Sequence, residues 1–183
     1  DVTECSTARA YAGPEYVVVR CLPNGGGQPF TAAVPQTGGT VDATISVIVR
    51  DGAGVPIVFY PFEDIWLESA DGGMVACAGG DNANFSTDAN GYTEWANPLQ
   101  AGGSSFGSTQ VVINGNAVPQ AVAVGFNSAD LDGSGAVNLT DVSLFAGDYF
   151  SGAYVFRADL FYDNDNNLSD IPFLAAGYGA ECP

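Results

Sequence analysis

The sequence contains no lysine and no histidine. Its only cationic side chains are four arginines, which face 21 aspartates and glutamates and leave a formal net charge of −17. Catalytic arrangements that need a histidine or a lysine, such as the Ser-His-Asp triad, cannot be built from this chain. So acidic a surface also repels nucleic acid and anionic lipid. We therefore expect a divalent cation as its natural partner, and no nucleic acid.

Long apolar runs are absent as well. No stretch approaches the ~20 residues that a membrane-spanning helix needs, and no signal peptide is visible at Asp1. We expect no membrane span, and an exported protein would be represented here by its mature form.

Four cysteines are present, and none of them shows CxxC spacing. Zinc is not expected, because thiolate sites usually place two ligands close together. The even number predicts two disulfides formed in an oxidising compartment, and hence a secreted or cell-surface protein. Three pairings are possible. We favour Cys5 with Cys21 and Cys77 with Cys182, because the first pair closes a short N-terminal loop.

Catalysis is not expected. A carboxylate pair of the glycosidase kind is the remaining route, but surface acids on strands are far commoner than catalytic pairs. The acids that could serve are Glu63, Asp64, Glu68 and Glu94. Aromatic side chains could form a sugar-binding platform, although packing in a core explains them equally well. These are Tyr60, Phe62, Trp66 and Trp95.

Short alternating apolar strings dominate the middle of the chain. The segment VDATISVIV, which starts at Val41, is rich in β-branched residues and ends at the turn sequence RDGAGVP. Comparable strings recur at intervals near ten residues, separated by Gly, Asn or Asp. This spacing predicts a mainly β fold, with an antiparallel β-sandwich over residues 41–126. The other strings are PIVFYP, DIWLES, MVACA, GYTEWA, TQVVING and AVAVGF.

The turn sequences in this region resemble those of a known family. VRDGAGVPI, followed by STDANGYTEW and then VVING, is similar to bacterial Ig-like domains of the invasin type. The resemblance covers about residues 40–120. It implies a sandwich that serves as a spacer, adhesin or scaffold element, and it brings no catalytic residue.

Residues 1–40 differ from the rest of the chain. The apolar string EYVVVRCL, at residues 15–22, precedes a Gly- and Pro-rich stretch. It can be a strand of its own domain, or it can pair with a sheet edge of a neighbouring subunit, because the flexible stretch lets it reach another chain.

The strongest motif lies at residues 130–141, which read D-L-D-G-S-G-A-V-N-L-T-D. In an EF-hand loop, oxygen ligands come from positions 1, 3, 5, 7 by its carbonyl, 9 and 12, with a glycine at position 6 for a sharp turn. Gly135 stands at that turn. An apolar face formed by Val142, Phe145 and Tyr149 predicts a helix after the loop. The predicted Ca²⁺ ligands are Asp130, Asp132, Ser134, the Ala136 carbonyl, Asn138 and Asp141.

The pattern recurs 29 residues later, where residues 159–170 read D-L-F-Y-D-N-D-N-N-L-S-D. Two positions depart from it: Phe161 at position 3 cannot ligate a cation, and Asn164 replaces the glycine at position 6. A second Ca²⁺ site is predicted here. Its ligands are Asp159, Asp163, the Asp165 carbonyl, Asn167 and Asp170.

Loops that end in Asp, each followed by one helix and repeated at this spacing, resemble dockerins. The resemblance covers about residues 128–180 and implies a small α-helical Ca²⁺-binding module, here residues 127–183, and a cohesin partner. Dockerins usually carry Ser/Thr pairs at loop positions 10 and 11 and a Lys-Arg pair on the next helix. This chain has Leu139-Thr140 and Leu168-Ser169 and no lysine. Cohesin recognition is therefore doubtful, and we predict that the leucines are core residues.

These observations predict a secreted, non-enzymatic structural subunit of an extracellular or cell-surface assembly. We expect a homo-oligomer or polymer, such as a helical filament, stabilised by Ca²⁺ and disulfides. The alternative is a binding module of a larger surface complex, with a cohesin-type protein or a carbohydrate as its target.

Overall fold

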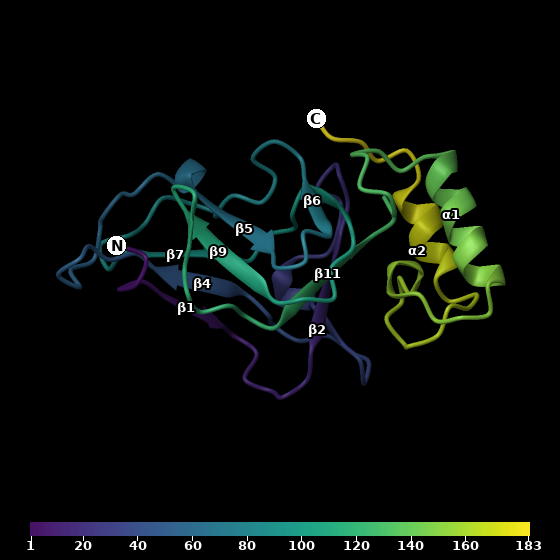
Figure 1. Cartoon of the computed structure of the whole chain (residues 1–183), viewed down its shortest axis with the longest axis horizontal. Coiled ribbons are helices and arrows are strands. Elements are labelled where there is room, and N and C mark those ends of the chain that lie inside the picture. Colours follow the sequence, from purple (N-terminus) through teal and green to yellow (C-terminus); the bar gives the residue numbers. More distant parts are fainter.

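The computed structural model describes residues 1–183 and is mainly β, with antiparallel sheets and two short helices. Figure 1 shows the strands spread over most of the long axis and both helices gathered at one end of it. None of the helices is long and apolar enough to cross a membrane.

One antiparallel sheet has the order β1-β4-β7, from β1 (Ser6–Arg9), β4 (Ile45–Ile48) and β7 (Tyr92–Trp95). Its side chains alternate as the sequence predicts: Ile45 and Val47 are fully buried, while the residues between them are partly exposed. Period-two alternation of this kind places one face of the sheet on the core.

A second antiparallel sheet has the order β10-β9-β5, from β5 (Ile65–Ser69), β9 (Thr109–Ile113) and β10 (Asn116–Ala117). A short 3-10 helix, η2 (Phe62–Asp64), leads into β5. Leu67 is fully buried and belongs to the same hydrophobic cluster as the inner residues of the first sheet. The two sheets therefore share one core.

The third sheet has the order β11-β2-β3, from β2 (Val17–Cys21), β3 (Val34–Pro35) and β11 (Val124–Ser128). Strand β2 is antiparallel to β3 and parallel to β11, so not every pairing is antiparallel. Its continuous apolar run is covered on both sides, since Val17, Val18 and Val19 are at most 1% exposed.

This burial decides between the two interpretations of EYVVVRCL. The segment contains the central strand β2 of its own chain, which pairs with β11 on one side and β3 on the other. The backbone of β2 therefore needs no sheet edge of a neighbouring subunit. Strand β1, from the same N-terminal segment, likewise pairs with β4. Residues 1–40 thus contribute strands to the sheets formed by later residues.

The rest of the β part is a small antiparallel pair, β6 (Met74–Ala76) with β8 (Ala101–Gly103), and the 3-10 helix η1 (Phe30–Ala32). Phe30 is fully buried and its ring meets that of Phe126 edge to face, with 6.2 Å between the centroids. These elements contribute Phe30, Met74 and Ala101 to the main hydrophobic core.

The helices are α1 (Leu139–Phe150) and α2 (Ile171–Gly177), with the 3-10 helix η3 (Phe156–Ala158) between them. Each α-helix starts at the end of one predicted metal loop. Residues of both loops and both helices form a second, smaller hydrophobic core. Its fully or nearly buried members include Leu131, Val137, Phe145, Ala158, Leu160 and Leu174.

The helical part is joined to the sheets without a linker. Asn127, at the end of β11, is 1% exposed and its side-chain amide donates to the carbonyls of Phe156 and Asp159, both at 2.9 Å. The guanidinium carbon of Arg20, on β2, lies 4.0 Å from the centre of the Phe173 ring. Buried contacts of this kind hold the two parts in a fixed relation.

The cysteines confirm one predicted disulfide and correct the other. Cys77 and Cys182 are bonded, with 5.7 Å between their Cα atoms, whereas Cys5 and Cys21 are free. Cys5 precedes β1 and its thiol lies against the backbone of Arg50, while Cys21 ends β2 in a different sheet. The separate sheets hold these two thiols apart, a constraint that loop length alone does not reveal.

We predict that iodoacetamide, applied to the native protein without reductant, modifies Cys5 alone. Cys21 should react only after unfolding, since burial raises the pKa of its thiol to about 12 and shields it from the reagent. Peptide mapping should recover Cys77 linked to Cys182. Reduction should remove about 4–5 kcal/mol of stability, the chain-entropy value for a loop of this length. A recovered Cys5–Cys21 peptide would contradict the structure.

Asp81 generates a second prediction about the fold. Burial, and to a smaller extent the charge of Glu68, raises the pKa of Asp81 to about 6. The stability tied to this group is complete below the unfolded-state pKa and is lost as the pH rises through about 6. Asp81→Asn should therefore melt at a higher temperature than wild type at pH 7.5 and at the same temperature near pH 3.5, both in EDTA.

Asp88→Asn is the matched control for this measurement. Hydrogen bonds from the backbone N–H groups of Tyr92 and Asn90 lower the pKa of Asp88. Its contribution is present above the unfolded-state pKa and is lost as the pH falls, so this variant should melt lower than wild type at pH 7.5. Equal shifts for the two variants would show that the buried carboxylate carries no penalty.

Candidate metal centre

The first predicted loop begins two residues after β11 and ends in the first turn of α1. Its backbone takes left-handed conformations at Gly133 (φ 67°) and Gly135 (φ 86°), which glycine adopts without steric cost. The chain is thereby wound into a turn that brings position 1 and position 12 together.

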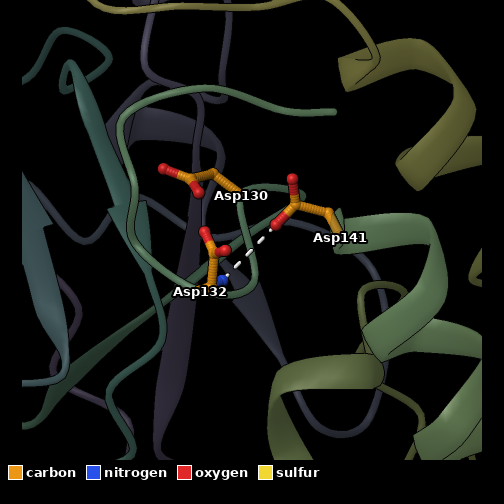
Figure 2. A group of neighbouring side chains, drawn as sticks. All are labelled: Asp130, Asp132 and Asp141. Carbon is orange, nitrogen blue, oxygen red and sulfur yellow. Dashed lines mark hydrogen bonds between the residues drawn. The ribbon is translucent and has the colours of Figure 1, made fainter. Parts of the chain in front are cut away.

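Two carboxylates from the ends of this loop are fully buried. Asp130 and Asp141 are both 0% exposed, and Asp132 at position 3 is exposed. One oxygen from each of these three residues lies within 4.8 Å of the others. Figure 2 shows the three carboxyl groups gathered at the loop, with Asp141 reaching in from the start of α1. In the whole chain no other group of three acidic or cysteine side chains converges in this way.

Backbone N–H groups hold the buried carboxylates in place. Asp130 accepts from the N–H groups of Ser134 at 3.0 Å and Gly135 at 2.9 Å. Asp141 accepts from Leu131 and from Asn138, both at 2.8 Å. These bonds orient the carboxylates but supply no positive charge.

The other predicted ligands also lie in the loop. The Ser134 hydroxyl reaches Asp130 at 3.4 Å and the Ala136 carbonyl at 3.3 Å, so position 5 contacts positions 1 and 7. Asn138 is the N-cap of α1: its side-chain oxygen accepts from Thr140 N–H at 2.8 Å. Position 9 of an EF-hand often acts through a water molecule, a role that remains open to a capping asparagine.

The second loop repeats several of these hydrogen bonds. Asp159 accepts from Asp163 N–H at 3.0 Å and Asn164 N–H at 2.9 Å, as Asp130 does from the equivalent residues. Asp170 accepts from Asn167 N–H at 2.9 Å. Tyr162 (φ 64°) and Asn164 (φ 68°) take the left-handed conformations that the two glycines take in the first loop. The duplicated sequence pattern thus produces a duplicated backbone.

The two loops differ in the side chains that lie near their first carboxylate and at position 3. In the second loop the phenol of Tyr154 donates to Asp159 at 3.0 Å. Phe161, at position 3, is 44% exposed and lies against the Phe173 ring at 5.9 Å between centroids. The sequence pattern did not indicate Tyr154, because it lies outside the loop. Only the first loop therefore has three converging carboxylates.

Electrostatics distinguish the loop positions. Burial raises the pKa of Asp130 to about 6, and the neighbouring carboxylates add to the shift. The pKa of Asp132 is lowered by a hydrogen bond from the Ser134 side chain. Burial also raises the pKa values of Asp159 and Asp170. Removing a carboxylate from water is unfavourable unless a cation or donor compensates it.

The donor set fits a hard cation. All predicted ligand atoms are oxygens, from carboxylates, a hydroxyl and a carbonyl, which is the chemistry that Ca²⁺ prefers. No arginine is paired with these carboxylates; the chain's one salt bridge joins Arg157 to Asp148, at 2.6 Å. The buried charge of the first loop therefore has no compensating side chain.

The first loop is tied to both the sheets and the C-terminal segment. Gly103 N–H, at the end of β8, donates to the Asp130 carbonyl at 2.7 Å. Cys182 N–H donates to the Gly135 carbonyl at 2.8 Å, and Val137 N–H to the Ala180 carbonyl at 2.8 Å. Because Cys182 is bonded to Cys77, the disulfide links the C-terminal segment that contacts this loop to the β part of the chain.

The expectation that Leu139 and Leu168 lie in the core is corrected, since each is 69% exposed. Leu139 is the first residue of α1, and Leu168 lies in the turn that precedes α2. Trp95 is fully buried and its indole N–H donates to the Asp81 carbonyl, so it cannot belong to a sugar-binding platform.

Comparisons with known proteins add little. No family model matches the sequence, and no curated protein matches it. Among solved structures, the crystal structure of the Lin-41 filamin domain is a neighbour at 13% sequence identity and a TM-score of 0.31, covering 68% of this chain and 94% of that chain. Similarity at this level carries no argument about function.

We predict that Asp130→Asn abolishes thermal stabilisation by Ca²⁺. If the site has a dissociation constant of ~10⁻⁴ to 10⁻³ M, as in extracellular modules, 10 mM Ca²⁺ stabilises wild type by about 1.4–2.7 kcal/mol. That corresponds to a melting-temperature rise of roughly 3–10 °C. In EDTA the variant should be as stable as wild type or more so, since it lacks a buried, uncompensated charge.

Asp165→Asn is the control, because that residue is exposed and its predicted ligand atom is the carbonyl, which the substitution keeps. It should retain the Ca²⁺-dependent rise. Equal losses for Asp130→Asn in Ca²⁺ and in EDTA would show that the carboxylate is structural and binds no metal.

Proposed function

We propose that the protein is an extracellular, Ca²⁺-stabilised structural subunit of a larger assembly. In this proposal the sheets form an Ig-like β-sandwich, and the two loops with their helices form a dockerin-like Ca²⁺-binding module. The observation that carries it is the convergence of Asp130, Asp132 and Asp141 at the joint between the sheets and the helices. The Cys77–Cys182 disulfide beside that joint is compatible with an extracellular location.

The ion would have a structural role: it would link the end of the sheets to the start of α1. When bound, Ca²⁺ supplies the positive charge that the buried carboxylates of the first loop lack. Asp130 stands at the end of the sheets and Asp141 in the first turn of α1, so one ion on both would fix the helix against the β part. Ser134 and the Ala136 carbonyl would complete the oxygen set. The disulfide and the ion would then constrain the same joint independently.

Assembly into a polymer is supported by the character of the surface. Lysine is absent, and charged residues make up 14% of the chain. Several large apolar side chains are exposed instead, among them Phe59 and Phe150. Such side chains gain free energy when another surface covers them.

A binding module is the second candidate. The exposed Leu139 and Leu168 stand at equivalent positions of the two loops and would suit a protein that docks on the helices. The chain departs from the cohesin-binding dockerin pattern at these same positions, so a different partner would be required.

Assembly can be tested by sedimentation and negative-stain microscopy of the full chain at rising concentration, in Ca²⁺, in Mg²⁺ and in EDTA. We expect polymers in Ca²⁺ and fewer or none in EDTA. Mg²⁺ should substitute poorly, because it demands a tighter octahedral site. Protein that binds Ca²⁺ by calorimetry yet stays monomeric at millimolar concentration would exclude the assembly and favour the binding module.

A further inference from the structure

One end of the molecule carries an uncharged apolar loop. Residues 55–62, between β4 and β5, read V-P-I-V-F-Y-P-F and contain no charged side chain. Phe59 is 79% exposed, and Val55 and Val58 are 57% and 42% exposed. An aromatic ring so far out of the fold loses hydrophobic free energy, unless another surface covers it.

Hydrogen bonds to Thr87 fix the backbone of this loop. Phe59 is one of four non-glycine residues with positive φ, at 57°. The conformation is imposed by Thr87, which is fully buried: its carbonyl accepts from Phe59 N–H at 2.9 Å, and its hydroxyl accepts from Tyr60 N–H at 2.8 Å. The Thr87 hydroxyl also donates to the Ile57 carbonyl at 2.6 Å. Strained, buttressed residues of this kind are concentrated at functional sites.

The opposite end carries an apolar groove. It lies between α1 and α2 and is lined by hydrophobic side chains alone, with Leu174 at its base. Residues 171–180, which form one wall, contain no charged residue. The lining residues are Val142, Ile171, Leu174, Ala175 and Tyr178.

The two surfaces lie at opposite ends of the long axis. Figure 1 shows α1 and α2 at one end, and the loop between β4 and β5 at the end where the N-terminus lies. A contact between them within one chain is therefore excluded. A contact between two chains would join the head of one to the tail of the next.

Charge favours contact between copies through segments that carry no acidic side chain. With a net charge of −17, two copies repel each other over most of their area. The loop at residues 55–62 and the groove wall at residues 171–180 contain no acidic side chain, and the exposed acids Glu63, Asp64 and Glu181 lie just beyond their ends. Both are apolar, and together they would bury what each leaves exposed.

We propose that Phe59 of one copy inserts into the groove between α1 and α2 of the next copy. The contact is heterologous, so it repeats along the chain of subunits and generates a filament, unless the rotation closes a ring. This inference rests on the proposed assembly and names its contact. Val142 and Ile171 directly follow the position-12 aspartates of the two loops. Ca²⁺ in the first loop would therefore set one wall of the groove.

The test measures the critical concentration for assembly of the full chain in Ca²⁺. Phe59→Asn should raise it about 30-fold, the equivalent of a ~2 kcal/mol hot spot. The variant should fold, because asparagine adopts positive φ more readily than phenylalanine. Phe150→Asn is the matched control: Phe150 is 82% exposed but lies outside the groove lining, and its loss should leave the critical concentration unchanged.

A mixing experiment tests the head-to-tail geometry. Phe59→Asn keeps the groove, and Ile171→Asn keeps the loop but adds a polar group to the groove. Each variant alone should be monomeric where wild type assembles, and an equimolar mixture should form a 1:1 dimer that does not grow. Unchanged melting temperatures in Ca²⁺ would show that both variants retain the metal site.

The outcomes separate this inference from the proposal on which it rests. If wild type assembles and Phe59→Asn assembles equally well, the contact is wrong and the assembly stands. If the mixture polymerises, the contact is not head to tail. If wild type stays monomeric while binding Ca²⁺, both the assembly and this contact are overturned.

Discussion

The joint between the sheets and the helices depends on a buried negative charge that no side chain compensates. Asp130 and Asp141 are fully enclosed, and their donors are backbone N–H groups and the Ser134 hydroxyl, none of which carries a charge. In a chain without lysine or histidine, and with its arginines engaged elsewhere, no side chain of opposite charge offsets the burial of these carboxylates. The fold thus gathers oxygen atoms of the kind that would suit the cation proposed above.

The surrounding elements are arranged around that position. Strand β8 donates to the Asp130 carbonyl, the C-terminal segment pairs with the loop at Gly135, and the disulfide returns that segment to Cys77. The second loop copies the backbone of the first but uses a tyrosine hydroxyl in place of a third carboxylate. Three carboxylates therefore converge in the first loop, and a tyrosine hydroxyl meets the first carboxylate of the second. The duplicated loops thus share left-handed positions in the backbone but differ in their polar side chains.

Local patterns predicted more than long-range contacts did. The alternating strings around Ile45 and Leu67 became strands of a mainly β fold, and the twelve-residue spacing placed Asp130 beside Asp141. The failures concern residues far apart in the sequence or side chains at element ends. Cys5 and Cys21 are close in sequence, but Cys5 precedes β1 and Cys21 ends β2, which lie in different sheets. Leu139 has the character of a core residue, and only the orientation of α1 shows that it is exposed.

The sequence by itself determined the features that twelve consecutive residues can encode: oxygen donors at fixed positions, left-handed turns at Gly133 and Gly135, and a capping asparagine before α1. Hydrogen bonds within so short a segment depend little on the rest of the chain. Only the tertiary structure decided that Val17–Cys21 is a central strand beside β11, that Cys77 pairs with Cys182, and which carboxylates are buried. Those outcomes depend on how segments up to about a hundred residues apart are placed in space, and no local pattern of residues encodes that placement.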